Sequence, residues 1–128
     1  MSTKQGMIYV IDDDASVRKA FGRLLRSAKL DAETFSSAEE FLSRPRQREN
    51  ACIIIDIRMP GLTGFDLLER LVTEGIRIPV IAVSADDDAE TREHAKELGA
   101  VSFFRKPVDD QALLDAIWWA IAGGRKKS

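Results

Sequence analysis

The chain has 128 residues, of which 45% are hydrophobic and 31% charged, as is usual for one globular domain. Its formal net charge of −2 gives no general attraction for nucleic acids or membranes. A single histidine and a single cysteine exclude the usual zinc sites and a Ser-His-Asp triad. Because Cys52 cannot form an internal disulfide and no stretch reads as a signal peptide or membrane span, we expect a cytoplasmic protein without membrane contact.

Short apolar runs alternate with helix-length segments along the chain. Strands are predicted over 7–11, 31–35, 52–56, 79–84 and 101–104, with 31–35 at an edge of the sheet. Helical spacing or capping signals predict helices over 14–29, 36–43, 63–74, 88–98 and 108–122. Continuous apolar strands are buried on both faces, so the predicted fold is α/β, a five-stranded parallel sheet with helices on both faces. We expect one domain over 1–122, with 123–128 as a flexible basic tail or the start of a linker.

Polar residues follow four of the predicted strands. Asp12 and Asp13 come after the first strand, Asp56 ends the third, Ser84 ends the fourth and Lys106 follows the fifth. In open parallel sheets, ligands bind beyond the carboxyl ends of the strands, where the strand order reverses. We therefore expect three carboxylates, one hydroxyl and one ammonium to lie at the same edge.

Each of these residues also has a plain structural interpretation. Asp13 or Asp14 could cap the first helix, and Asp56 could simply end a strand. Ser84 could cap a turn, and Lys106 could be a solvated loop lysine. Their common location makes a joint function the better interpretation. Clustered carboxylates suit Mg²⁺, an aspartate can act as a nucleophile toward phosphorus, and a lysine can offset phosphoryl charge.

At these residues the sequence resembles response-regulator receiver domains. The segments "VIDDDASVR", "IIIDIRMPGLTGFDLL", "PVIAVSA" and "FFRKPVDDQALLDAI" occur in the family's order, and the resemblance covers about residues 6–122. It implies a flavodoxin-like fold of five strand–helix units. It also implies a phosphorylation-dependent signalling switch of a two-component system rather than an enzyme, although such a domain assists its own phosphotransfer and autodephosphorylation.

The resemblance assigns roles to individual residues. Asp56 would accept the phosphoryl group, and Ser84 and Lys106 would contact it. Asp12, Asp13, Asp56 and the backbone carbonyl of Arg58 would bind Mg²⁺, with Asp13 the more direct ligand of the acidic pair.

The resemblance further implies switch residues and partners. Ser84 and Phe103 would rearrange on phosphorylation, and the Lys106–Pro107 bond would be cis. A sensor histidine kinase or a phosphotransfer protein would donate the phosphate. The face made by the fourth helix, fifth strand and fifth helix would then bind a downstream protein or a second copy. The cognate kinase and any output domain cannot be read from the chain.

Three other functions compete with this one. A phosphate-independent binding module of the same fold should lack one of the key residues, and none is lost. A flavodoxin-like nucleotide binder needs a phosphate loop after the first strand, where this chain has "DDDAS". A phosphatase with Asp12 as nucleophile and Asp14 as its partner would leave Asp56 and Lys106 unexplained.

Two further features carry expectations. Arg58 and Asp86 each lie two residues beyond a strand end, so their side chains could pair as a lid across the phosphorylation site. The resemblance implies that these two positions control the lifetime of the phosphate. On the last helix, the predicted buried stripe consists of Leu113, Ile117, Ala120 and Ile121. About 100° per residue places Trp118 near the edge of this stripe and Trp119 almost opposite it. We expect these tryptophans to form part of a partner or dimer face.

Overall fold

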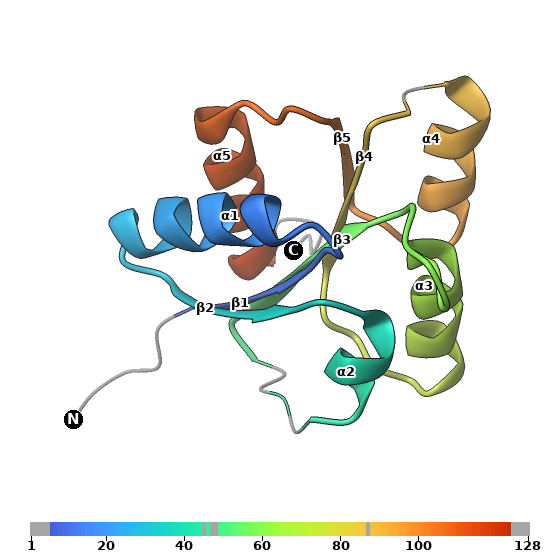
Figure 1. Cartoon of the computed structure of the whole chain (residues 1–128). Coiled ribbons are helices and arrows are strands. Elements are labelled where there is room, and N and C mark those ends of the chain that lie inside the picture. Colours follow the sequence, from blue (N-terminus) through green and yellow to red (C-terminus); the bar gives the residue numbers. More distant parts are fainter. Residues whose placement is uncertain (1–5, 45, 47–48, 87, 124–128) are drawn as a thin grey trace.

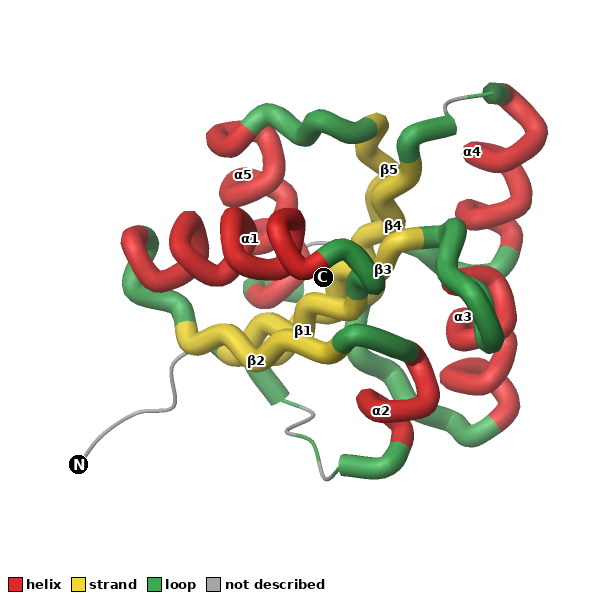
Figure 2. The backbone as a smooth tube through the Cα atoms, in the orientation of Figure 1, coloured by secondary structure: helices red, strands yellow, loops and turns green. Residues whose placement is uncertain are grey.

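The computed structural model describes residues 6–44, 46, 49–86 and 88–123. Its parallel sheet has the strand order β2-β1-β3-β4-β5, with helices on both faces (Figure 1, Figure 2). The strands are β1 (Met7–Ile11), β2 (Asp31–Phe35), β3 (Ala51–Asp56), β4 (Val80–Ser84) and β5 (Ser102–Arg105). The helices are α1 (Ala15–Ser27), α2 (Ala38–Leu42), α3 (Gly64–Thr73), α4 (Ala89–Glu97) and α5 (Asp110–Ile121).

The sheet divides the core into two layers, because successive side chains of a strand point to opposite faces. In β1, Ile8 and Val10 pack with α1 and α5, whereas Tyr9 and Ile11 pack with α2, α3 and α4. Cys52 belongs to the first layer, and burial raises the pKa of its thiol to about 12.

The predicted elements are all present, and the differences lie at their ends. The first helix begins at Ala15 rather than at residue 14, because the Asp14 side chain caps it by accepting from the Ser16 and Val17 amides. Ser37 caps α2 in the same way. The last strand is shifted by one residue from the predicted 101–104 to Ser102–Arg105. Most of the predicted tail, 124–128, lies outside the described residues.

The strand order reverses beside β1, which pairs with both β2 and β3. The chain thus leaves the carboxyl ends of β1 and β3 in opposite directions, which opens a crevice there. Among the described residues, no helix is long and apolar enough to cross a membrane.

Gly64, the first residue of α3, packs directly behind the carboxyl end of β3. A Cβ at this position would lie 2.7 Å from both the Asp56 carbonyl oxygen and the Ile57 Cα. Both are backbone atoms, so the loop itself would have to shift. We predict that Gly64→Ala lowers the free energy of unfolding by about 1–3 kcal/mol in urea denaturation.

Gly22 within α1 is the matched control for this substitution. Its added Cβ would meet the mobile end of Arg26 at 3.3 Å, so Gly22→Ala should be neutral or stabilising by up to about 1 kcal/mol. Equal effects of the two substitutions would contradict the close contact inferred at Gly64.

Candidate functional site

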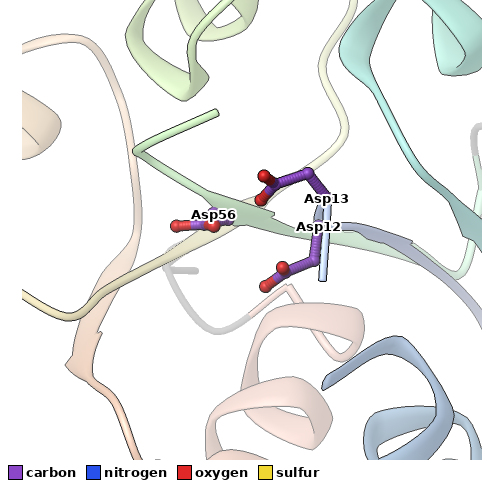
Figure 3. A group of neighbouring side chains, drawn as sticks. All are labelled: Asp12, Asp13 and Asp56. Carbon is purple, nitrogen blue, oxygen red and sulfur yellow. The ribbon is translucent and has the colours of Figure 1, made fainter. Parts of the chain in front are cut away.

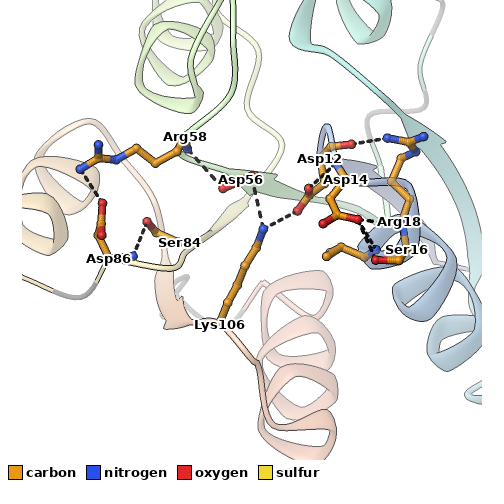
Figure 4. Close-up of polar contacts among 10 residues, drawn as sticks. Asp12, Asp14, Ser16, Arg18, Asp56, Arg58, Ser84, Asp86 and Lys106 are labelled. Carbon is orange, nitrogen blue, oxygen red and sulfur yellow. Dashed lines mark hydrogen bonds and ion pairs between the residues drawn. The ribbon is translucent and has the colours of Figure 1, made fainter.

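The carboxyl ends of the strands bring together the buried residues of the site. Asp12 follows β1, Asp56 ends β3 and Ser84 ends β4, and their exposed fractions are 1%, 5% and 0%. Lys106 follows β5 and reaches back across the sheet edge (Figure 4). Its Nζ lies 2.9 Å from Asp12 Oδ2 and 3.3 Å from Asp56 Oδ2. The structure therefore joins the four strand ends as the sequence predicted.

The charges of this cluster are only partly balanced. Burial raises the pKa of Asp56, and the charge of Asp12 adds to this, while Lys106 and the Arg58 amide act in the opposite direction. Burial alone would lower the pKa of Lys106, but its contacts with Asp12 and Asp56 outweigh this and raise it. One ammonium thus faces two buried carboxylates, which favours the approach of a further positive charge.

A third carboxylate, that of Asp13, completes an acidic group (Figure 3). Asp12, Asp13 and Asp56 each offer an oxygen atom, and these atoms lie within 4.8 Å of one another. Oxygen ligands suit hard cations such as Mg²⁺. Asp12 Oδ1 already accepts from the Asp14 amide at 2.9 Å and Oδ2 faces Lys106, whereas Asp13 is exposed. This donor set fits a divalent cation and favours Asp13 as its more direct ligand.

The loops that follow β3 and β4 are joined by an ion pair. Arg58 Nη2 lies 2.7 Å from Asp86 Oδ2, and both side chains are exposed. The Arg58 amide donates to Asp56 Oδ1 at 3.2 Å, and the Asp86 amide donates to Ser84 Oγ at 3.1 Å. The pair thus joins the segments that carry the buried aspartate and the buried hydroxyl, as Figure 4 shows.

The aromatic residue near the site lies on β5. Phe103 pairs with Ala82 of β4 and is half-buried, with the Arg92 guanidinium 4.8 Å from the centre of its ring. The Lys106–Pro107 peptide bond is cis. The sequence did not predict the contact of Arg92 with Phe103. It also did not predict that Arg18 donates to the Asp12 carbonyl oxygen at 2.7 Å. Neither contact has a signal in the spacing of residues.

Comparisons with known proteins agree with this geometry. The family model of the response regulator receiver domain matches residues 8–118. The chain belongs to the response-regulator receiver family. The transcriptional regulatory protein TdiR of Thauera aromatica is 38% identical over 128 residues, which cover 98% of this chain and 56% of TdiR. The receiver domain described here thus spans about half the length of the curated relatives it matches.

Solved structures match this receiver domain over nearly its whole length. The response regulator StyR has a TM-score of 0.86 at 38% identity, covering 95% of this chain and 63% of that one. The FixJ-N structure has a TM-score of 0.85 at 30% identity, covering 94% and 96%. The receiver domain therefore belongs to the class found in two-component response regulators, which is consistent with a phosphorylation-dependent signalling switch.

The two tryptophans of the receiver domain lie on α5, away from the acidic group. Their exposed fractions are 47% for Trp118 and 48% for Trp119. Trp118 is therefore more exposed than its predicted place near the edge of the stripe suggested. Leu113, Ile117 and Ala120 are buried as expected, whereas Ile121 is only partly buried. The buried stripe is narrower than predicted, which leaves both tryptophans outside it.

The raised pKa of Asp56 has a consequence for stability. The native state holds this proton more tightly than the unfolded state, so ionising Asp56 costs stability as the pH rises through its raised pKa. We predict that Asp56→Asn raises the free energy of unfolding at pH 7 in metal-free buffer, since Lys106 retains its contact with Asp12. The gain should vanish below about pH 4, the usual range of an aspartate.

Denaturation in urea across this pH range would measure the effect. Asp31→Asn, at an exposed position of β2, is the control for the loss of one negative charge. An Asp56→Asn protein that is no more stable than the wild type at pH 7 would contradict the charge balance described above.

Proposed function

We propose that this domain accepts a phosphoryl group on Asp56 and that Mg²⁺ is required. The arrangement of Asp56 carries the proposal: a buried carboxylate lies 3.3 Å from the Lys106 ammonium, inside a group of three aspartates. The donor would be a sensor histidine kinase or a phosphotransfer protein. The domain would act in the cytoplasm, as an acceptor and not as an enzyme with a separate substrate.

The residues divide the chemistry among themselves. A carboxylate oxygen of Asp56 attacks phosphorus, the bond from phosphorus to the donor atom breaks, and an aspartyl phosphate results. Lys106 offsets negative charge on the phosphoryl oxygens, and the Ser84 hydroxyl donates a hydrogen bond to one of them. Asp12, Asp13, Asp56 and the Arg58 carbonyl would hold Mg²⁺, which when bound supplies further positive charge to the phosphoryl group.

A conformational change at the site would be transmitted along β4 and β5. Phe103 lies opposite Ala82, two residues before Ser84, so the ring and the hydroxyl occupy the same face of adjacent strands. A displacement of Ser84 toward a phosphoryl group would free space that Phe103 could enter. The surface of α4, β5 and α5 would change with it and alter the affinity for a downstream protein or a second copy. Since TdiR is named a transcriptional regulatory protein, control of transcription is the output we favour.

Phosphorylation by a small donor tests the assignment of Asp56. Incubation with acetyl phosphate and Mg²⁺ should add one phosphoryl group per chain, seen as a mass shift of the intact protein. Asp56→Asn should abolish the shift, and Asp13→Asn should raise the Mg²⁺ concentration needed for it. Asp31→Asn should behave as the wild type. Undiminished labelling of Asp56→Asn would exclude this residue as the acceptor.

The Arg58–Asp86 pair should lengthen the life of the phosphate. The two side chains are exposed, so the pair adds only about 0–1 kcal/mol to stability. The pair joins the loops after Asp56 and Ser84, and we propose that this restricts the approach of water to the phosphoryl group. We predict that Arg58→Ala and Asp86→Ala each speed the loss of phosphate by at least about twofold, and that the double substitution adds less than the sum of the two.

Decay of the phosphorylated protein, followed by ³¹P NMR after removal of the donor, measures these rates. Asp86→Ala keeps the backbone amide that donates to Ser84, so it tests the carboxylate alone. Arg70→Ala breaks an exposed ion pair with Glu74 in α3 and is the matched control. Rates that are unchanged, or strictly additive effects, would rule out a lid.

The exposed tryptophans extend the proposal to a contact surface. Trp118 and Trp119 together present two large apolar side chains on α5, and such groups are frequent in protein interfaces. We predict that Trp119→Ala weakens self-association or partner binding of the phosphorylated protein. Sedimentation with and without acetyl phosphate measures the self-association. Val72→Ala, another exposed apolar position, is the control. Unchanged association of Trp119→Ala, together with unchanged partner binding, would refute this role.

A further inference from the structure

The side chain of Arg18, in α1, contacts the backbone of Asp12. Its Nη1 donates to the Asp12 carbonyl oxygen at 2.7 Å, a hydrogen bond strengthened by the charge of the guanidinium (Figure 4). The Asp12 amide donates to the carbonyl oxygen of Phe35, the last residue of β2, at 3.1 Å. The backbone of Asp12 is therefore held on both sides, by a helix side chain and by the neighbouring strand.

The rest of this loop is held in a related way. The Asp14 amide donates to Asp12 Oδ1 at 2.9 Å, and the Asp14 side chain caps α1. Asp13 lies between these two fixed residues, and its side chain is exposed. The orientation of the Asp13 carboxylate thus depends on how firmly its neighbours are held.

We propose that Arg18 is a positioning residue for the cation site. By holding the Asp12 carbonyl oxygen, it fixes the loop so that the Asp13 carboxylate already faces Asp56 before a cation arrives. Its hydrogen bond engages the backbone oxygen of Asp12 and not a carboxylate oxygen. The inference rests on the proposed Mg²⁺ site.

A substitution of Lys19, the next residue of α1, distinguishes the loss of the hydrogen bond from the loss of a positive charge. Lys19 carries the same charge as Arg18 but is exposed on the outer side of α1. Arg18→Met and Lys19→Met therefore remove equal charge and leave similar apolar side chains, and only the first removes the hydrogen bond to Asp12. Arg18→Lys keeps the charge and a shorter donor, so it should fall between the wild type and Arg18→Met.

The test is a Mg²⁺ titration of the full chain, read by the melting temperature, for the wild type and the three variants. Arg18→Met should need a Mg²⁺ concentration on the order of tenfold higher for the same stabilisation, as is usual when a group that orients a metal ligand is lost. Lys19→Met should stay within about twofold of the wild type. Melting curves in metal-free buffer show whether each variant is folded. If Arg18→Met does not fold, the Mg²⁺ titration of Arg18→Lys replaces it in the comparison.

A second measurement separates positioning from a general loss of structure. At saturating Mg²⁺, the rate of phosphorylation of Arg18→Met by acetyl phosphate should return to within about twofold of the wild-type rate. If the melting temperatures of Arg18→Met and Lys19→Met depended on Mg²⁺ concentration in the same way, the role of Arg18 would be refuted. The proposed Mg²⁺ site would not be affected by that result. A rate that stays low at saturating Mg²⁺ would also overturn the role of Arg18. A wild type that shows no response to Mg²⁺ would refute both the site and the role of Arg18.

Discussion

The contact of Lys106 with two buried carboxylates is the interaction on which the site depends. Asp12 and Asp56 lie at the ends of neighbouring strands, where burial and mutual repulsion oppose their charges. One ammonium, within 3.3 Å of both, offsets part of this cost. The exposed Asp13 adds a third carboxylate, so the apo site keeps an excess of negative charge. That excess, on residues positioned by the strands, is the feature that would attract a cation.

The fold makes this concentration of charge possible. Parallel strands place their carboxyl ends at one edge of the sheet, so residues far apart in the sequence meet there without a dedicated loop. The rigid part of the site is buried in the sheet, as Asp56 and Ser84 show. The exposed part lies in the loops that follow β3 and β4, where Arg58 pairs with Asp86. In the function we propose, the buried residues would hold the acceptor and the exposed pair would influence how long the phosphate survives.

The sequence predicted most of this arrangement, for identifiable reasons. Apolar runs and capping residues define the strands and helices, and the position of a residue after a strand places it at the sheet edge. Asp12, Asp56, Ser84 and Lys106 could therefore be brought together without coordinates. Side-chain contacts across a helix surface have no such periodic signal. In the sequence, nothing distinguishes Arg18 from other polar residues of α1, and only the structure shows its hydrogen bond to Asp12. The similar exposure of Trp118 and Trp119 likewise depends on how α5 packs.

We propose that Asp56 forms an aspartyl phosphate, and chemical trapping tests this assignment most directly. The protein is incubated with acetyl phosphate and Mg²⁺, unfolded in acid and treated with sodium borohydride, which reduces an acyl phosphate to an alcohol. Peptide mass spectrometry then locates the reduced residue. The structure predicts homoserine at position 56 and unmodified aspartate at positions 12 and 13. Homoserine at either of those two positions, or at none of the three in a protein that carries phosphate, would contradict the account.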